Sequence, residues 1–472
     1  MQASACRRLA SQLRALESGE PAAAPTAAER PALPGLRKTL VEAPASGIRD
    51  LMVKSAALEA ARKPDDPRVI HLEVGQPDHP TPPHILQATS EAVLTDPSMT
   101  QYIANAGIDR LRELVAERIT RESPSVVTTM EHCLVTPGAV ASMASAFAVC
   151  LDPGTEVLVP DPGWPNYGLS ATILGATLVP YPCPATNAWL PDIDALAAAV
   201  TDKTRMIVLC NPSNPTGAVI PESLLRQILE LAAARGLFVL ADEIYHDISY
   251  DDEPPASTLE IAQELDMLSH VLLIGGASKS FAMTGFRVGW LRATEDIIEQ
   301  GKKCQEAFTS CGVPFAQAGA CAALEGDQDV VTGMRDSYKQ RRDIAVATLE
   351  KHGMAPAAIP GGAFYMLLPC STVHSHHSHH HHHRHRRRRR HHTAPRRAAS
   401  DGPDALAQDM SVREDSTAFC LELLEKKFVA TAPGATFGDE SEGFIRISLA
   451  AADEDIEEGI ERLCEFIQER EA

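Results

Sequence analysis

The sequence lacks several patterns that would place it in a specialised class of protein. Its 11 cysteines include no C-x-x-C pair and are scattered along the chain, so neither a disulfide framework nor zinc-ligand spacing is present. Two long uncharged runs, 133–151 and 162–191, are interrupted by proline, glycine and hydroxyl residues. We therefore expect a reducing compartment, no metal site and no transmembrane helix.

A net positive charge is also missing. The chain has 63 Asp and Glu against 43 Lys and Arg, which gives a formal net charge of −20. Eight of the arginines lie in one segment between residues 370 and 400, so the rest of the chain is more acidic still. Because nucleic-acid binding needs a basic face to neutralise phosphates, the composition argues against a nucleic acid as partner.

Most of the 472 residues have the amino-acid composition of an ordinary globular protein. Hydrophobic residues make up 44% and charged residues 22%, which excludes a fully disordered or fibrous chain. The length suits two or three domains, or one large α/β unit with a satellite. A core of normal size is therefore expected.

Two segments depart from this composition. Residues 1–38 begin with arginines and no acid and continue as an Ala/Pro-rich stretch, which is typical of either a disordered extension or a transit peptide. We expect a cytoplasmic protein, or an organelle-matrix protein if the extension is a transit peptide. Residues 371–408 contain a His/Arg tract without apolar spacing, so we expect a low-complexity insertion that loops outward.

Elsewhere, short apolar runs alternate with helical stretches, which predicts a mostly parallel sheet covered by helices on both faces. The expected strands are 71–74, 133–136, 156–160, 206–210, 238–241, 271–274 and 288–291, and the expected helices are 108–121, 139–150, 222–235, 296–308 and 328–352. From about Gly353 the pattern changes to α+β. We expect a large domain over 75–325 and a small domain formed by 39–74 and 326–472.

Candidate functional residues follow the strands, because ligands of such sheets bind at the carboxyl ends of the strands. Lys279 lies after the run VLLIGG, where partial burial would lower its pKa enough for Schiff-base chemistry. Ser278 and Arg287 nearby are suited to a phosphate. Taken alone, a lysine in a Ser/Gly loop such as Lys279 is far more often a solvated point charge, and the alternative for Arg287 is a surface ion pair.

Three further strand ends carry polar or aromatic groups. Asp242 and Tyr245 end the run LFVLADEIY, where a carboxylate could hold a heteroaromatic nitrogen protonated. Asn214 lies in the turn NPSNPTG, and Trp164 could stack on a flat ring. Gly138 precedes a helix whose N-terminus could bind phosphate. Helix capping by Asp242 and core packing by Tyr245 and Trp164 are the alternatives.

In combination these motifs resemble the class I/II aminotransferases, which are pyridoxal-phosphate enzymes of fold type I. ASKSFAMTGFRVGW and NPSNPTG carry the resemblance, and DEIY, LEVGQPDHPTP, PGGAFY and APGATFG follow the order of the family. The spacing Tyr102-x4-Gly107-x3-Leu111-Arg112 also agrees. The similarity spans roughly 40–370 and 405–470. It implies a large cofactor-binding domain with a smaller α+β domain.

The resemblance also implies roles for individual residues. Lys279 would form the Schiff base with the cofactor and move a proton between substrate and cofactor, and Asp242 would pair with the pyridinium nitrogen. Tyr245 and Asn214 would bind the ring oxygen, and Trp164 would stack on the ring. The remaining cofactor contacts would come from Gly138, Ala139, Val140, Ser278, Arg287 and, from the partner subunit of a homodimer, Tyr102. Arg446 would bind the substrate α-carboxylate, with Gly75 and Asn214 near it.

Two departures from the family pattern qualify these expectations. Gly276 replaces a serine that contacts the phosphate in many relatives, so one donor is missing. Val140 stands where some aspartate-specific relatives have a basic residue, which argues against strict specificity for acidic substrates. We expect a ping-pong aminotransferase acting on L-amino acids and 2-oxo acids. The alternatives are a carbon–sulfur β-lyase on the same scaffold and a non-catalytic binding protein.

Overall fold

The computed structural model describes residues 35–41, 47–371 and 414–472. Contacts divide the chain into Met1–Ala43 and Pro44–Ala472, and the first unit has one described helix, α2 (Lys38–Val41). Most of the expected N-terminal extension (1–38) and nearly all of the expected insertion (371–408) lie outside the described residues. Within the described ranges, no helix is both long and apolar enough to cross a bilayer. All other described helices and strands belong to the unit Pro44–Ala472.

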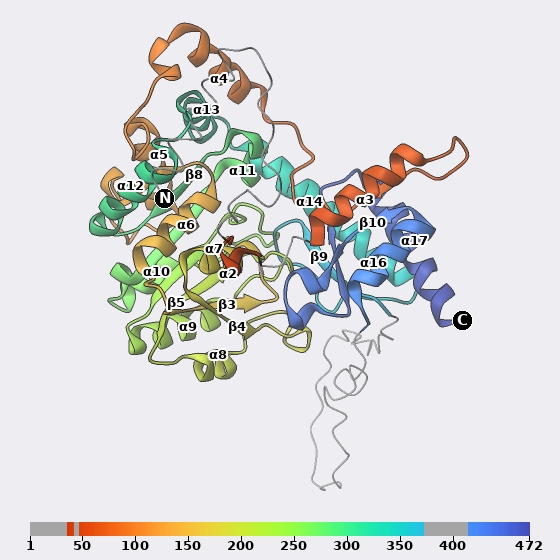
Figure 1. Ribbon diagram of the computed structural model, residues 1–472. Helices are drawn as coiled ribbons and strands as arrows, with labels where there is room; N and C mark the ends of the chain where they lie inside the picture. Colours follow the sequence, from red (N-terminus) through yellow and green to blue (C-terminus); the bar gives the residue numbers. More distant parts are fainter. Residues whose placement is uncertain (1–34, 42–46, 372–413) are drawn as a thin grey trace, which may run out of the picture. The chain divides into compact units, whose positions relative to one another are not determined.

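A seven-stranded sheet forms the centre of this unit (Figure 1). Its order is β2-β8-β7-β6-β5-β3-β4, and β8 is antiparallel to both of its neighbours while the other pairs are parallel. The strands are β2 (Cys133–Thr136), β3 (Glu156–Asp161), β4 (Thr177–Pro182), β5 (Thr204–Cys210), β6 (Phe238–Asp242), β7 (Val271–Gly276) and β8 (Gly289–Arg292). The predicted mostly parallel α/β sheet is therefore confirmed.

Helices cover both faces of this sheet because its central strands are apolar on both sides. In β6, Val239 belongs to one apolar cluster and Leu240 to another, and successive strand residues point to opposite faces. The helices of this part are α4 (Pro83–Thr95), α5 (Asp109–Glu122), α6 (Ala139–Cys150), α7 (Asn166–Leu174), α8 (Ile193–Ala199), α9 (Glu222–Arg235), α10 (Thr258–Glu264), α11 (Ala277–Ser280), α12 (Glu295–Thr309) and α13 (Pro314–Glu325).

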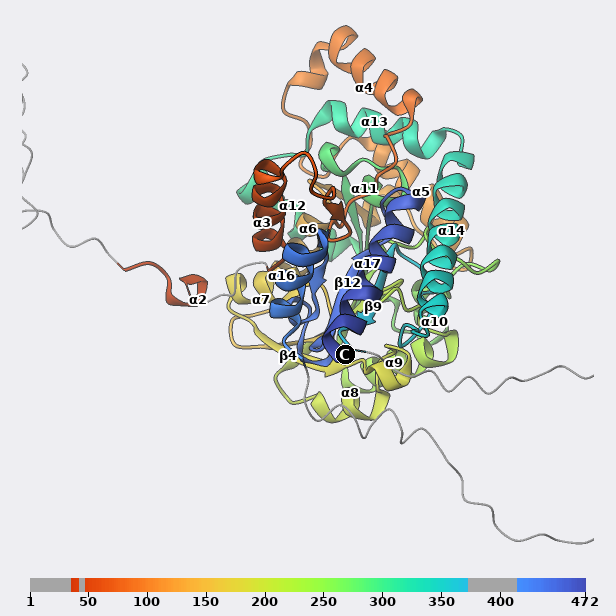
Figure 2. The same cartoon turned by 90° about the vertical axis from the view of Figure 1, so that its right-hand side faces the viewer.

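Two smaller sheets have their own apolar cluster. An antiparallel sheet has the order β11-β12-β9, and β1 pairs in parallel with β10. The elements here are α3 (Gly47–Ala61), β1 (Ile70–His71), α14 (Asp329–Lys351), β9 (Tyr365–Pro369), α16 (Ser416–Lys427), β10 (Val429–Ala430), β11 (Ala432–Pro433), β12 (Phe444–Ser448) and α17 (Asp453–Glu471). Helices α14 and α17 pack side by side (Figure 2). The boundaries of the large and small domains stay a prediction.

The first strand differs from the expected range 71–74, because β1 covers only Ile70–His71. Leu72 still forms hydrogen bonds with main-chain groups of Ala430 and Ser448. The main chain after it binds side chains instead. The carbonyl oxygen of Glu73 accepts a hydrogen bond from Arg446 Nη2 at 2.7 Å, and that of Gly75 accepts one from Lys279 Nζ at 2.7 Å. After β1 and Leu72, the main-chain carbonyl groups thus accept hydrogen bonds from two cationic side chains.

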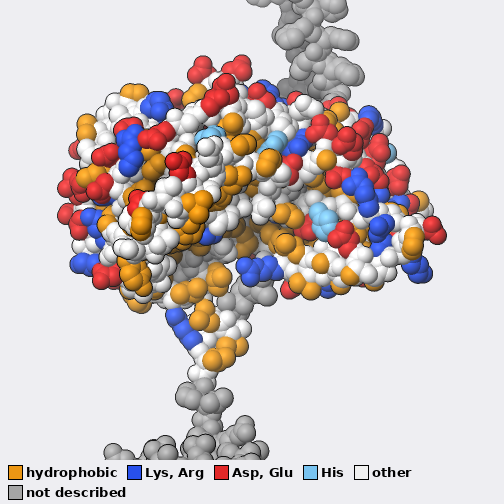
Figure 3. All heavy atoms as spheres, turned by 90° about the horizontal axis from the view of Figure 1, so that it is seen from above, with side chains coloured by type: hydrophobic (Ala, Val, Ile, Leu, Met, Phe, Trp, Pro, Cys, Tyr) orange, Lys and Arg blue, Asp and Glu red, His pale blue; other side chains and the backbone are white. Residues whose placement is uncertain are grey.

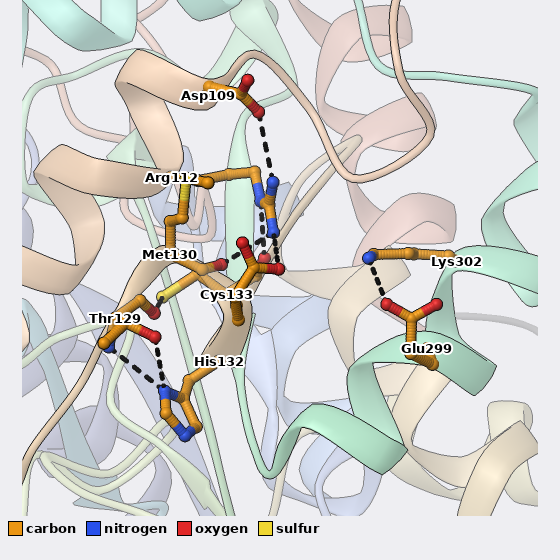
Figure 4. A network of polar contacts seen from close by, with 9 residues as sticks. Asp109, Arg112, Thr129, Met130, His132, Cys133, Glu299 and Lys302 are labelled. Atoms are coloured by element: carbon orange, nitrogen blue, oxygen red, sulfur yellow. Dashed lines mark hydrogen bonds and ion pairs between the residues drawn. The ribbon is translucent and has the colours of Figure 1, made fainter.

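A buried arginine fixes helix α5 against the start of β2. Arg112 Nε donates to the carbonyl oxygen of Cys133 at 3.1 Å, and its Nη2 donates to that of Met130 at 2.8 Å (Figure 4). Its Nη1 lies 3.2 Å from Oδ1 of Asp109 in the first turn of α5. Because its donors are used within the scaffold, Arg112 has a structural role.

The described cysteines are free, and most of them are buried.

On the face of the molecule seen from above, acidic and basic side chains are interspersed (Figure 3). Interspersed charges of both signs produce a weaker field over this face than a patch of one sign would.

Candidate active site

A cavity of about 340 Å³ lies at the carboxyl ends of β5, β6 and β7. Its lining includes eleven of the residues predicted from the sequence, which are Gly75, Ala139, Val140, Trp164, Asn214, Asp242, Tyr245, Ser278, Lys279, Arg287 and Arg446. The small sheet contributes Arg446 and Tyr365. The cavity therefore joins strand ends of the large sheet to side chains from the small sheet.

Lys279 lies on the short helix α11, which begins directly after β7. Its Nζ donates to the Gly75 carbonyl oxygen and lies 5.6 Å from the ring centroid of Phe364. Burial lowers the pKa of Lys279 to about 8, helped by the charges of Arg446 and Arg287 and opposed by Asp242. A useful fraction of the amine is therefore neutral and nucleophilic at slightly alkaline pH.

Asp242 is the last residue of β6 and is 3% exposed. Its Oδ2 accepts a hydrogen bond from Tyr167 Oη at 2.6 Å, and its Oδ1 accepts one from the Ile244 N–H at 3.3 Å. Burial raises the pKa of Asp242 to about 6, although Tyr167, Ile244 and the charge of Lys279 act in the opposite direction. The carboxylate is thus held by two donors inside the cavity.

Arg446 on β12 is 2% exposed and has two aromatic neighbours. Its guanidinium carbon lies 4.3 Å from the ring centroid of Tyr365 and 4.8 Å from that of Phe437. Its Nη1 donates to Asn214 Oδ1 at 3.2 Å, whereas Nε is buried and has no hydrogen-bond partner among the described residues. Burial lowers the pKa of Arg446. An unpaired buried donor on a cation is suited to an incoming carboxylate.

A third group of residues forms the corner expected to bind phosphate. Gly138 precedes helix α6 with φ of 89°, and a side chain there would collide with the guanidinium of Arg287. Arg287 Nη1 donates to the Thr284 carbonyl oxygen at 2.7 Å, which orients the side chain. Ser278 lines the cavity beside Lys279. A helix N-terminus, a hydroxyl and a guanidinium together suit a phosphate dianion.

The crowded surroundings of Gly276, at the end of β7, explain why glycine replaces the serine of the family pattern. A Cβ at this position would lie 3.0 Å from the Val288 carbonyl oxygen and 3.1 Å from Ile244 Cδ1. Both distances are shorter than ordinary contacts, so a serine would require its neighbours to move. The close packing of β7 against β8 therefore favours glycine here.

Of the predicted site residues, Tyr102 and Gly138 do not line the cavity, and only Tyr102 lies away from it. Its side chain is 88% exposed and is absent from the lining. Gly138 is also not counted in the lining, although it adjoins Ala139 and Arg287 there. The role assigned to Tyr102 therefore stays a prediction that requires a second subunit.

Two tyrosines of the site were assigned no role from the sequence. Tyr167 donates to Asp242, and Tyr365 places its hydroxyl 2.9 Å from that of Tyr245 and its ring on Arg446. Tyr365 ends the motif PGGAFY, and Tyr167 lies three residues after Trp164. The signal was therefore present, but the contacts that define their roles connect distant segments.

The comparisons with known proteins agree with this geometry. The family model for aminotransferase class I and II matches residues 67–463. An aspartate aminotransferase of Streptomyces avermitilis is 33% identical over 416 residues, which cover 88% of this chain and 92% of the relative. An aromatic-amino-acid aminotransferase 2 of Thermococcus litoralis is 30% identical, with 85% of this chain and 92% of the relative covered.

Solved structures show the same architecture. The aspartate aminotransferase of Rhizobium meliloti superposes with a TM-score of 0.78 at 28% identity, covering 92% of this chain and 99% of that one. That of Thermotoga maritima gives 0.76 at 29% identity, covering 92% of this chain and all of the other. Similarity of fold and of sequence therefore extends over nearly the same part of the chain.

Proposed function

The chain belongs to the aminotransferase class I and II family and is a pyridoxal-phosphate-dependent aminotransferase, and we propose that it works in two half-reactions through Lys279. Its substrates are amino acids and oxo acids. The observation that carries the proposed mechanism is the single cavity that holds the Lys279 amine, the buried Asp242 carboxylate and the Arg446 guanidinium. These three groups suit, respectively, an aldehyde, a protonated ring nitrogen and a substrate carboxylate.

The described residues fit the cofactor at each of its ends. Ser278, Arg287 and the N-terminus of α6 would bind its phosphate, and Asp242 would hold a proton on its ring nitrogen. Trp164 would stack on the ring, and Asn214 and Tyr245 would hydrogen-bond its phenolic oxygen. When bound, pyridoxal phosphate supplies an electron sink and a carrier for the amino group between the two half-reactions.

Lys279 Nζ would move the proton at the substrate Cα. Its lowered pKa allows it to accept a proton near neutral pH, and the Gly75 carbonyl oxygen orients the amine. Arg446 would hold the α-carboxylate so that the Cα–H bond stays in reach of this amine. The burial of Asp242 and Arg446 keeps water away from the two groups that fix the substrate and the ring.

A homodimer with shared sites is the assembly that we propose. Tyr102 is fully available for contact with another subunit, and exposed apolar side chains occur on α4 and α13. They include Leu86, Val93, Leu94 and Phe315. Burying these side chains against a second copy of the chain would stabilise a dimer. Tyr102 could then reach the residues of the partner subunit that are proposed to bind the phosphate.

Aspartate is the donor to test first, because several relatives are named aspartate aminotransferases. Val140 nevertheless lines the cavity with an aliphatic side chain, so donors with uncharged side chains belong in the same panel. The panel pairs each donor with 2-oxoglutarate or pyruvate as acceptor. Without an acceptor we expect at most one equivalent of oxo acid per active site, because the amino group then stays on the enzyme, and with an acceptor we expect continued turnover.

The experiment uses the full chain with pyridoxal phosphate, the variant Lys279→Ala and, as a control, Lys302→Ala outside the cavity. We expect a visible absorbance band that Lys279→Ala abolishes or shifts and that the control retains. Continuous turnover of a single amino acid with release of ammonia would identify the β-lyase alternative instead. A colourless wild-type chain without transfer activity would refute both enzymes.

A further inference from the structure

Tyr167 contacts two residues that are proposed to hold the cofactor ring. It is the second residue of α7 and is 1% exposed. Its hydroxyl donates to Asp242 Oδ2 at 2.6 Å, and its ring meets that of Trp164 edge to face, with centroids 5.4 Å apart at 90°. The carboxylate belongs to β6 and the tryptophan to the loop after β3. One side chain therefore connects two strand ends of the site.

The hydrogen bond has an electrostatic consequence for Asp242. Burial raises the pKa of this carboxyl group, and the hydroxyl of Tyr167 is its nearest side-chain donor. The other titratable groups facing it are the Lys279 amine, the Cys210 thiol and the Glu243 carboxyl group. Only Lys279 among these brings a positive charge. Tyr167 itself stays protonated, because burial raises its pKa well above the usual value.

We propose that Tyr167 is a positioning residue of this active site, whose hydroxyl keeps Asp242 ionised and aimed into the cavity while its ring sets the orientation of Trp164. The inference rests on the proposed function, because it concerns how the same site holds pyridoxal phosphate. A hydrogen bond to a charged group contributes more than one between neutral groups, so its loss should weaken cofactor binding by roughly tenfold.

Tyr181 offers a matched control in the neighbouring strand β4. It is also 1% exposed, and its hydroxyl donates to the carbonyl oxygen of Val208 at 2.7 Å. Its partner is a main-chain group, and Tyr181 does not line the cavity. Tyr181→Phe thus removes an equally buried hydroxyl without touching a carboxylate. Any effect common to both variants reports only on packing.

The test compares Tyr167→Phe with Tyr181→Phe in the full-length holoenzyme. The dissociation constant of pyridoxal phosphate is measured from pH 5 to 9 by its visible absorbance, and the unfolding temperature checks the fold. For Tyr167→Phe we expect the dissociation constant of pyridoxal phosphate to be about tenfold larger than for the wild type near neutral pH. On acidification, we also expect the variant to lose its affinity for the cofactor at a pH about one unit higher than the wild type does. The reason is that the ionised form of Asp242 loses a hydrogen-bond donor, which raises the pKa of this carboxyl group.

A second variant keeps the hydroxyl and guards against a folding defect. With 3-fluorotyrosine at position 167 the phenol is a stronger donor, so the acidic loss of cofactor affinity should move to lower pH. Equal constants and equal pH profiles for Tyr167→Phe and Tyr181→Phe would overturn the inference, as would no shift with 3-fluorotyrosine. A wild-type chain that binds no pyridoxal phosphate would instead refute the proposed function itself.

Discussion

Arg446 is a buried cation whose surroundings orient it without neutralising it. Two aromatic rings lie close to it, and two oxygen atoms accept hydrogen bonds from its terminal nitrogens, while Nε has no partner in the part of the chain that the structure describes. Neither of these oxygens belongs to a carboxylate, since one is the main-chain oxygen of Glu73 and the other is the amide oxygen of Asn214. The guanidinium therefore keeps its charge available for a substrate carboxylate.

Arg446→Lys should consequently impair substrate binding more than folding. The lysine keeps a positive charge but loses the planar pair of donors, so we expect kcat/KM for the amino donor to fall about 100-fold, mainly through KM, which is equivalent to about 2.7 kcal/mol. Steady-state kinetics with both substrates measure this effect. Arg226→Lys on the surface is the control. An unchanged KM in Arg446→Lys would place the carboxylate elsewhere.

Lys279 should react as an unusually acidic lysine. Burial and two neighbouring arginines lower its pKa to about 8, so below this pH the neutral fraction of the amine falls about tenfold per unit. Acetylation of the cofactor-free chain, measured at this residue by mass spectrometry, should reach half of its maximal rate near pH 8. A midpoint close to the usual lysine value of 10.5 would mean that the amine is solvated.

The sequence located most cavity residues, some because they follow a recognisable strand and others, such as Arg446, only through the family resemblance. Asp242, Asn214 and Lys279 end up together since neighbouring parallel strands bring their carboxyl ends to one edge. The role of Tyr167 could not be predicted, because its partner Asp242 lies 75 residues away in the sequence. No local pattern encodes which carboxylate a tyrosine will meet.

At the scale of elements, the end of β3 is joined to the loop that follows β11. Asp161 accepts hydrogen bonds from the N–H groups of Asp439 at 3.2 Å and Glu440 at 3.1 Å. Gly438 precedes them with φ of 139°, and a Cβ there would collide with the Asp161 carboxylate. Phe437, the residue before this glycine, packs on Arg446. The contact thus connects a cofactor-side strand to the substrate-side arginine.

Gly438→Ala should disturb this connection in a specific way. The positive φ and the collision with Asp161 both oppose the side chain, so we expect a loss of about 1–3 kcal/mol in stability and a several-fold higher KM for the amino donor. Thermal unfolding and steady-state kinetics measure the two effects. Gly154→Ala, at a φ of 87° with open space around it, is the control for a positive φ without a collision. An equal KM in the two variants would contradict the link to Arg446.

Helix α5 carries a second buried arginine, Arg118, which forms ion pairs with two carboxylates. Arg118 Nη2 lies 2.6 Å from Asp247 Oδ1, and Arg118 Nε lies 2.9 Å from Glu122 Oε1. Burial acts to raise the pKa of Asp247, but the charge of Arg118 outweighs it and lowers the pKa to about 2. A carboxyl group with a lowered folded-state pKa stabilises the fold above its unfolded value, near 3.8.

The stabilisation from Asp247 should therefore be complete above about pH 4 and disappear as the pH falls toward 2. We expect this group to contribute ~2 kcal/mol at neutral pH. Asp247→Asn should cost about 3 kcal/mol at pH 7, because Arg118 would lose its closest counter-charge in a buried position. Urea unfolding from pH 2 to 7 tests both statements. A constant difference between variant and wild type across that range would refute the assigned titration.

Elements with strong local signals were predictable, and those defined by distant partners were not. Helix α9 has the predicted bounds, since Pro221 precedes it and Gly236 ends it in a left-handed conformation. Strand β4 was not expected, because Pro180 and Pro182 interrupt its pattern. As an edge strand it can accommodate them. The two-residue strand β1 exists only through its pairing with β10.

At the scale of the whole molecule, the proposed homodimer would make the active site a property of two chains through Tyr102. It is exposed in this chain, although the motif that contains it resembles the family pattern in which the residue serves the neighbouring subunit. A symmetric dimer exchanges the same residue in both directions, so each cavity would combine one chain's Lys279 with the other chain's Tyr102. Mutations at the two positions should therefore complement each other.

We expect Lys279→Ala to be inactive and Tyr102→Phe to be weakened through loss of a phosphate contact. In a heterodimer of the two variants, one cavity carries both substitutions and the other carries neither. Random mixing gives heterodimers as half of all dimers, so activity should return to about a quarter of the wild-type value. The variants are unfolded together, refolded and assayed, with separately refolded variants as controls. Because a cavity built from one chain alone cannot be repaired by exchange, activity equal to the average of the two controls would show that Tyr102 does not act across a dimer.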